Sequence, residues 1–387
     1  MRLDAVRGLF LVIMAGVHVP SPVSHGLQQP FGFTSAAEGF IFLSACLAGL
    51  VYGKAYRKSG WQAMSHKVWN RAKLVYIVHL AVLLPVMLAA WAYSGQITPL
   101  ANHFHEFLVH PWGSLILLPL LLHQPPLFDI LPLYVVLLVA TPLVFASARR
   151  HGWGLVLAFS ALGWLAAQWQ SACFPFDSAA LLPVRWGSFN LFSWQFLWIA
   201  GLALGETSFR RQTLPQNIRV VLGGLAAVVV LTGFCARHGI IPCPLTSPEH
   251  YFWIDKWTLG PLRLLNFSAW VVLLLVWNPR PPGWLLGPTA LLGRHSLAVF
   301  ALHLPLAVTA TTVIQMFSLT NTEQTIIALS VIASIFIWVA WLEDNARQRA
   351  QITICPDHDT ESLPWFKRLQ YREIIRSIPL KSSLPTG

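Results

Sequence analysis

Long apolar stretches separated by short polar ones run through most of the chain. An α-helix rises about 1.5 Å per residue, so about 20 apolar residues cross the hydrocarbon core of a bilayer. Ten segments approach this length, at residues 7–21, 34–54, 71–93, 128–147, 152–168, 187–207, 219–236, 259–278, 294–316 and 323–342. The pattern predicts an all-α, polytopic membrane protein with about ten transmembrane helices.

Composition agrees with this prediction, because 55% of the 387 residues are hydrophobic and only 11% are charged. The net charge of +11 would also suit a nucleic-acid partner. However, with the N-terminus inside, all but four of the 26 Lys and Arg residues fall on the cytoplasmic side, the exceptions being Arg185, Arg237, Lys256 and Arg263. The positive-inside rule then places both termini in the cytoplasm. We therefore expect membrane lipids as partners and no nucleic acid.

The apolar segments divide the chain into a transmembrane domain, residues 1–343, and a polar cytoplasmic tail, residues 344–387. The longest outer excursion, 94–127, contains an apolar stretch at 114–122 that is too short to cross and predicts an interfacial or re-entrant helix. Two cysteines in outer loops, Cys173 and Cys243, either form a disulfide or are two unrelated small residues.

His18 lies in an otherwise apolar span that begins at Arg7. His18 is eleven positions after Arg7, which puts it roughly 16 Å deeper than Arg7 and near the middle of the bilayer. An ionisable side chain is costly at that depth, so it usually marks function or has a partner. His18 is therefore the main catalytic candidate.

Glu38 and His303 are the candidates to accompany His18. Glu38 is expected about 6 Å from the outer face, within reach of His18 if their helices are neighbours. A carboxylate beside an imidazole prepares a general base, although the same pair can simply hold two helices together. His303 is nine residues from Arg294, at roughly 14 Å depth, which suggests one cavity shared with His18 or a hydrogen bond to a neighbouring helix.

Basic residues crowd the predicted inner ends of the second and third spans. They are Lys54, Arg57, Lys58, Lys67, Arg71 and Lys73, joined by Arg7. Arg and Lys bind phosphate through charge-assisted hydrogen bonds, but topology and anionic lipids already explain most of this set. Arg7, Arg71 and Lys73 are the substrate-binding candidates, and the first two, each at the inner end of a span, have the stronger case.

Two further polar residues lie within predicted spans. Asp129 either contacts substrate or caps the N-terminus of its helix, and we favour the cap. Gln195 is expected to line a cavity. In an outer loop, His103, His105, Glu106 and His110 have a loose metal-ligand spacing without a matching second half, so no metal is expected.

Several segments together are similar to the acyltransferase-3 superfamily of membrane acyltransferases, and to its OpgC family in particular. Arg7 followed by ten residues and His18 resembles the R-x10-H signature of the superfamily. The OpgC resemblance rests on Phe31–Ser44, Phe128–Tyr134, Phe189–Gln195 and Gly293–Leu297 with His303. It therefore covers most of residues 1–316.

This resemblance implies a ten-helix enzyme of the bacterial inner membrane that succinylates osmoregulated periplasmic glucans from a cytoplasmic acyl-CoA. It implies that His18 is the catalytic base, that Arg7 lies near the donor, and that Glu38 and His303 occupy the positions of the acid in the second span and of a polar residue in a late span. The sequence departs from the pattern at Ser44-Ala45, where the family has Ser-Gly.

We therefore expect an O-acyltransferase that moves a short acyl group to hydroxyls of a periplasmic glucan or other carbohydrate. Succinyl-CoA or acetyl-CoA would be the donor substrate, with no permanently bound cofactor. His18 would act either as a general base or through an acyl-imidazole. The alternative is a proton-coupled transporter that uses His18 and Glu38 as a relay. No inverted repeat typical of transporters is visible in the sequence.

Overall fold

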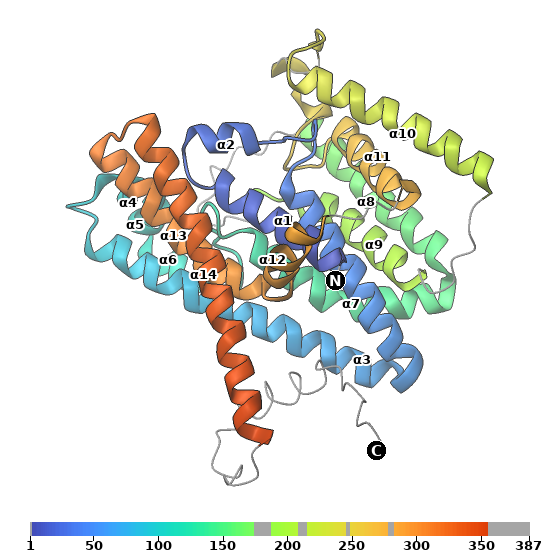
Figure 1. The fold of residues 1–387 in the computed structure, drawn as a ribbon, viewed down its shortest axis with the longest axis horizontal. Helices are drawn as coiled ribbons and strands as arrows, with labels where there is room; N and C mark the ends of the chain where they lie inside the picture. The colour runs from blue at the N-terminus through green and yellow to red at the C-terminus, as the bar shows by residue number, and fades with distance from the viewer. Residues whose placement is uncertain (1, 174–186, 208–214, 245–247, 278–281, 355–387) are drawn as a thin grey trace, which may run out of the picture. The chain divides into compact units, whose positions relative to one another are not determined.

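The computed structural model describes residues 2–173, 187–207, 215–244, 248–277 and 282–354 (Figure 1). Side chains are not described for 170–173, 248–249 and 348–354. The chain divides into two compact units, Met1–Ala333 and Ser334–Gly387, so the division falls before the boundary expected at residue 343. Each unit is described by itself.

The described residues form helices and contain no β-strand. The helices are α1 Arg2–Val17, α2 Pro22–Leu27, α3 Ala36–Ala92, α4 Thr98–His103, α5 His105–Val109, α6 Pro111–Leu117, α7 Ile130–His151, α8 Trp153–Cys173, α9 Leu191–Thr207, α10 Gln216–Arg237, the 3-10 helix η3 Pro248–Trp253, α11 Pro261–Trp277, α12 Gly283–Arg294, α13 Ser296–Phe317 and α14 Asn321–Ile354. The all-α prediction is confirmed for this part of the chain.

Every segment predicted to span the membrane overlaps a helix. Two of them are joined in α3, which bends at Gly60, where φ is 78°. Within the described residues, five helices are long and apolar enough to cross a membrane: α3, α7, α10, α13 and Asn321–Arg347 of α14. Trp153–Trp169 and Pro261–Trp277 are shorter apolar helices. The chain is thus a helical membrane protein, and the number of crossings and the side of each end stay predictions.

Two helical regions differ from expectation. Residues 283–294 form α12, for which the apolar pattern gave no separate element. In the outer excursion, three short helices replace the single interfacial helix expected at 114–122, and α6 covers only the start of that stretch. Proline explains part of this subdivision, since Pro99 and Pro111 each lie in the first turn of a helix, where their missing N–H costs nothing.

α1 packs against α12 with their backbones nearly in contact, and glycine makes this possible. A Cβ atom built on Gly8 would lie 1.8 Å from the carbonyl oxygen of Thr289, and one on Gly293 would lie 1.9 Å from that of Asp4. No side chain fits at either position. This contact brings Arg7, the neighbour of Gly8, to the start of α13, only one residue beyond the end of α12.

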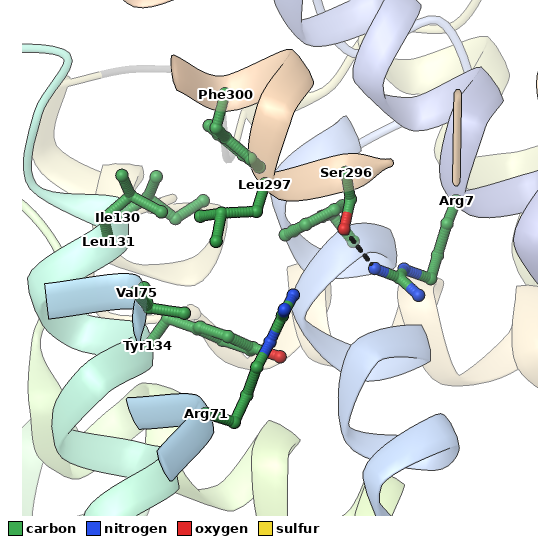
Figure 2. Close-up of a pocket in the computed structure, with 10 residues that line it drawn as sticks. Arg7, Arg71, Val75, Ile130, Leu131, Tyr134, Ser296, Leu297 and Phe300 are labelled. Atoms are coloured by element: carbon green, nitrogen blue, oxygen red, sulfur yellow. Dashed lines mark hydrogen bonds between the residues drawn. The ribbon is translucent and has the colours of Figure 1, made fainter. Parts of the chain in front are cut away.

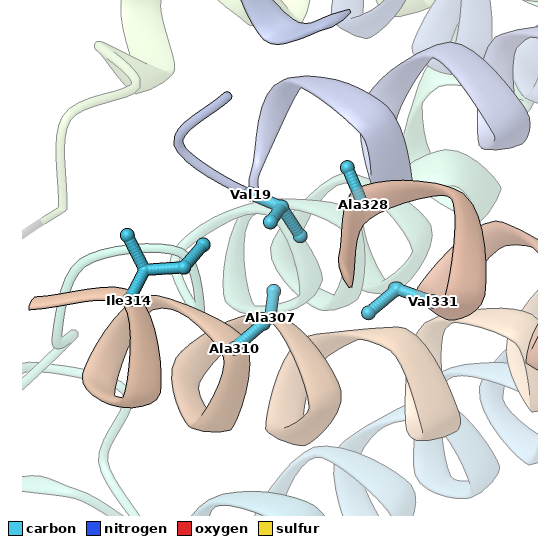
Figure 3. Packing of buried hydrophobic residues seen from close by; sticks show 6 residues of the cluster. All are labelled: Val19, Ala307, Ala310, Ile314, Ala328 and Val331. Carbon is cyan, nitrogen blue, oxygen red and sulfur yellow. The ribbon is translucent and has the colours of Figure 1, made fainter. Parts of the chain in front are cut away.

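The other end of α1 is fixed by a small apolar core (Figure 3). Val19 is fully buried in a cluster with Ala307, Ala310 and Ile314 of α13 and with Ala328 and Val331 of α14. Small side chains allow close approach of helices in a membrane. The cluster therefore places the residue before Val19, which is His18, against α13.

The second unit is described from Ser334 to Ile354, the end of α14. Trp338 and Trp341 stack with ring centroids 5.0 Å apart. The alternatives for Cys173 and Cys243, a disulfide or two unrelated residues, lie outside the described side chains, because that of Cys173 is among those not described.

Candidate active site

Two imidazole rings meet at the centre of the candidate site. His18, just after α1, and His303 of α13 stack with centroids 5.3 Å apart, and Nδ1 of His18 lies 3.2 Å from Nε2 of His303. His303 is fully buried, whereas His18 is partly exposed. The structure thus contains the hydrogen bond between neighbouring helices that the sequence analysis gave as one alternative for His303. We call them the histidine pair.

The contacts of His303 assign the tautomers of the pair. Its Nδ1 lies 3.1 Å from the carbonyl oxygen of Val299, one turn earlier in α13. A carbonyl only accepts, so His303 carries its proton on Nδ1 and leaves Nε2 as an acceptor. His18 then donates from Nδ1 to that nitrogen, and its own Nε2 keeps the lone pair. The geometry thus makes Nε2 of His18 the nitrogen that can take up a proton.

The expected partnership of Glu38 with His18 is not what the structure contains. Glu38, in the first turn of α3, accepts a hydrogen bond of 2.7 Å from Nη1 of Arg263, and both side chains are buried. Its other oxygen accepts from the backbone N–H of Ser35 at 3.0 Å and from the Ser35 hydroxyl. The carboxylate therefore balances a buried arginine and caps its own helix. The tautomer of His18 is set by His303.

Further charges surround this ion pair. Lys256 interacts electrostatically with Glu38, Arg263 and Asp129, and also with His18. Its ammonium lies 4.7 Å from the ring centroid of Trp257 and 5.9 Å from that of Phe189, which are cation–π distances. Burial lowers the pKa of Lys256, and the negative charge of Glu38 opposes this shift. We call Glu38, Arg263, Lys256 and Asp129 the Glu38 cluster.

Asp129 precedes α7, and its side chain does not cap that helix. Its backbone is already in the right-handed helical region, with φ −82° and ψ −19°, whereas a capping residue is usually extended. Oδ2 instead accepts a hydrogen bond of 2.9 Å from the backbone N–H of Ser188. The predicted cap is therefore wrong, and Asp129 ties the start of α7 to the segment before α9.

Residues of α1 and α13 also line a pocket that contains two arginines (Figure 2). It is lined by Arg7, Phe40, Arg71, Val75, Ile130, Leu131, Tyr134, Ser296, Leu297 and Phe300. Its volume of about 20 Å³ admits a water-sized or carboxylate-sized group only. We call it the arginine pocket.

The two guanidinium groups of this pocket are held differently. Nη2 of Arg7 donates to the hydroxyl of Ser296 at 2.5 Å, and Asp4 is 3.8 Å away. Nε of Arg7 is buried without a hydrogen-bond partner among the described residues. Arg71 projects into the same pocket beside Tyr134 (Figure 2). No acidic residue lines the pocket in the described part of the chain, so it presents an excess of positive charge.

α13 connects the arginine pocket to the histidine pair. Ser296 and Phe300 line the pocket, and His303 follows one turn after Phe300, with ring centroids 5.2 Å apart. Phe300 also meets Phe40 edge to face at 5.0 Å. Two buried aromatic rings therefore form the floor of the pocket, and the imidazoles lie directly beyond it.

α3 repeats this order of residues. Arg71 and Val75 line the pocket, and His79 follows on the same helix face, four residues later. His79 is buried, and its two ring nitrogens have no hydrogen-bond partner among the described residues. A buried polar group without a partner is costly, which sets His79 apart from the other residues of this helix face.

Lys73 and Gln195 do not join the site. Lys73 is exposed, and because it is two residues from Arg71 it lies on another face of α3. Gln195 of α9 binds α8, accepting from the Ser160 hydroxyl at 2.6 Å and donating to the Ser160 carbonyl at 2.8 Å. Its amide thus holds two helices together, and Gln195 is not among the residues that line the arginine pocket.

A buried acid that the sequence analysis missed lies at the end of α9. Glu206 accepts hydrogen bonds from Arg57 at 2.5 Å and from Arg149 at 3.4 Å, and its other oxygen accepts from Trp153 at 3.1 Å. These residues join α3, α7, α8 and α9. The sequence did contain a signal for Glu206, because it is an acidic residue at the predicted inner end of a span, where basic residues dominate.

The helices and the site together define a polytopic helical membrane protein with a histidine pair, an arginine pocket and a second cluster of charges. The family model described as OpgC protein matches residues 1–348, so the chain belongs to the OpgC family. Membership makes it a transferase related to the glucan succinyltransferases. Comparisons with curated proteins and with solved structures gave no match.

Proposed function

We propose that the protein is an O-acyltransferase of the bacterial inner membrane that moves a short acyl group from cytoplasmic acyl-CoA to a hydroxyl of a periplasmic glucan. The family relation favours succinyl over acetyl as the acyl group. The observation that carries the proposal is the histidine pair, in which His303 prepares Nε2 of His18 as a proton acceptor, on the same helices that supply Arg7 and Ser296 to the arginine pocket.

The donor would approach from the arginine pocket. Arginine binds phosphate and carboxylate in charge-assisted hydrogen bonds, and the buried Nε of Arg7 still lacks a partner among the described residues. The pocket is too small for a whole coenzyme, so it would hold one anionic group of the donor while the thioester lies nearer the histidine pair. Basic residues around Arg71 make this end the cytoplasmic one under the positive-inside rule.

The acceptor would approach from the Glu38 cluster. Nε2 of His18 takes the proton of a glucan hydroxyl while the hydroxyl oxygen attacks the thioester carbonyl. The new C–O ester bond forms, the C–S bond breaks, and the departing thiolate receives the proton from His18 as free CoA. General-base catalysis of this kind is worth about 10²–10⁴-fold. In the two-step variant, Nε2 first attacks the thioester carbonyl, and the C–S bond breaks to give an acyl-imidazole and the CoA thiolate. The glucan oxygen then attacks this acyl group, the N–C bond breaks, and the hydroxyl proton passes to the thiolate.

His303 would act as the positioning residue for this base. By holding Nδ1–H of His18, it presents Nε2 in the form that accepts a proton, and it can share the positive charge when His18 is protonated. In many enzymes a carboxylate holds the imidazole of the catalytic base. Here the carboxylate of Glu38 is already bound by Arg263 and Ser35, so His303 would take that role.

The test is mass spectrometry of periplasmic glucans from a deletion strain that expresses either the normal chain or a variant. His18→Ala should abolish acyl substitution, whereas His25→Ala, a matched change of an exposed histidine in α2, should leave it intact. Membrane abundance of both variants is measured in parallel. Normal substitution by an abundant His18→Ala protein would refute the mechanism, and unsubstituted glucans with the normal chain would refute the function.

A further inference from the structure

A second cavity, which shares no lining residue with the arginine pocket, lies between α4, α5 and the segment 123–126. Its volume is about 170 Å³, far larger than that of the arginine pocket. Asn102, His103, Glu106, Phe107, His123 and Pro126 are among the residues that line it. We call it the His103 pocket. It contains three members of the outer histidine-rich set that the proposed mechanism does not use, His103, His105 and Glu106.

His103 supplies an unsatisfied acceptor. One of its ring nitrogens hydrogen-bonds the backbone of Pro126, which has only a carbonyl to offer, so that nitrogen is the donor. The Nε2 atom is buried and has no hydrogen-bond partner among the described residues. In a neutral imidazole this nitrogen carries a lone pair, and leaving it unpaired is costly. The ligand that fits would bring a hydrogen-bond donor such as a hydroxyl.

The charges of the pocket exclude other ligand classes. Burial lowers the pKa of His103, so its ring is neutral at pH 7. The described lining contains Glu106 but neither Lys nor Arg, so nothing there attracts phosphate or carboxylate. No group of three His, Cys, Asp or Glu in the described residues is placed to hold a metal ion. An uncharged, polar ligand remains.

The walls of the pocket suit a sugar ring. Asn102 and Glu106 bring amide and carboxylate groups that pair with hydroxyls, while Phe107, Pro125 and Pro126 offer apolar surface to the C–H face of a ring. Small-molecule sites commonly combine an apolar lining with a few polar groups that fix orientation. Two phenylalanines of this region, Phe104 and Phe107, are buried and thus form a rigid wall.

The segment 123–129 connects the His103 pocket with the Glu38 cluster. His123, Pro125 and Pro126 line the pocket, and Gln124 contacts the segment before α9, where a Cβ on Gly187 would lie 2.3 Å from its Oε1. At the end of the segment, Asp129 binds Ser188 and interacts with Lys256. One short segment therefore lines the His103 pocket at its start and joins the Glu38 cluster at its end.

We propose that the His103 pocket binds an uncharged sugar unit of the acceptor glucan, at a distance from the unit that is acylated. This inference rests on the proposed function, because it takes a glucan as the acceptor. It makes His103, Asn102 and Glu106 specificity-determining residues that touch the glucan but not the reacting atoms.

The experiment measures binding and transfer separately on the full chain in detergent. The probe is unsubstituted periplasmic glucan from the deletion strain, and binding is followed by equilibrium dialysis without acyl-CoA. His103→Phe keeps a planar ring and removes the acceptor nitrogen, so the affinity for glucan should fall about fivefold to tenfold, the effect of one or two lost hydrogen bonds. The acceptor KM should rise by the same factor, with kcat and the donor KM unchanged.

Two further variants act as controls. His110→Phe makes the same change at an exposed histidine that does not line the pocket, and it should leave binding unchanged. His103→Gln retains an acceptor and should restore at least part of the affinity. If the His103→Phe protein does not fold, the glucan affinity of His103→Gln still tests the inference.

The outcomes separate the inference from the function beneath it. Normal glucan binding by a folded His103→Phe protein would show that the pocket holds only water, and the inference would be wrong whether or not transfer occurs. The inference would also be wrong if the unaltered chain does not bind the glucan. Weakened binding by the variant, together with no acyl transfer by the unaltered chain, would instead support the pocket and refute the acyltransferase.

Discussion

The arginine pocket and the Glu38 cluster contain similar charged residues, but their charges are balanced differently. In the Glu38 cluster, the carboxylate of Glu38 is fully bound by Arg263 and Ser35. In the arginine pocket, two guanidinium groups face a cavity without an acidic residue in its described lining. Buried charges with internal partners stabilise a fold, whereas a buried excess of one sign points to a ligand.

This difference predicts that the two regions respond oppositely to mutation. Changes in the Glu38 cluster should first lower stability, and changes in the arginine pocket should first lower affinity for the donor.

The largest effect is expected for Glu38→Ala. This change leaves the buried Arg263 without its carboxylate, which should reduce stability by about 3–5 kcal/mol. Thermal denaturation in detergent, followed by size-exclusion chromatography, measures the loss. Glu323→Ala is the matched control, because Glu323 receives the same two hydrogen bonds from Thr320 at the start of α14 but is exposed. Equal losses of stability in both variants would mean that Glu38 acts only as a helix cap.

A second effect concerns the histidine pair itself. His303→Phe removes the nitrogen that holds His18 and should lower kcat about 100-fold or more, within the range of general-base catalysis, with little change in either KM. His303→Gln, which can still accept a hydrogen bond, should retain more activity. Steady-state kinetics with acyl-CoA and glucan distinguish the two variants. An unchanged kcat in His303→Phe would remove His303 from the mechanism.

The arginine pocket is tested by the pair Arg71→Gln and Lys73→Gln. Arg71 lines the pocket and Lys73 does not, so the first change should raise the donor KM about tenfold while the second leaves it unaltered. The worth of one charge-assisted hydrogen bond sets that factor. Similar increases in both variants would mean that the region attracts the donor only through its general positive charge.

The smallest effect is expected for Gln195→Ala. Its amide joins α8 and α9 through Ser160, so its loss should cost about 1 kcal/mol of stability. Neither KM should change. If the donor KM or the acceptor KM rises while the stability equals that of the unaltered chain, Gln195 binds substrate.

The sequence contained the depth of each polar residue but not the direction in which it points. Counting along helices placed His18 and His303 at one level, and the structure confirms that they touch. The same counting paired Glu38 with His18, because nothing in the pattern shows that Arg263, at the start of α11, turns inward beside Glu38. Helix rotation is decided by packing between segments distant in the chain.

Other errors have local causes. Charge alone grouped Lys73 with Arg71, although a helix turns residues two apart to different faces. Residue type alone predicted a cap at Asp129, where the backbone conformation prevents it. Glu206 went unnoticed because a single acid near a helix end has no periodic signature, and its role becomes visible only with Arg57 and Arg149 beside it.

The glycine contact between α1 and α12 has a consequence for how a substrate can enter. With Gly8 against Thr289 and Gly293 against Asp4, the first helix and the start of α13 form one stiff block that includes Arg7 and Ser296. That wall of the arginine pocket cannot retreat by itself. Any widening of the pocket for a larger ligand therefore depends on the opposite wall, where α3 and α7 contribute Arg71 and Tyr134.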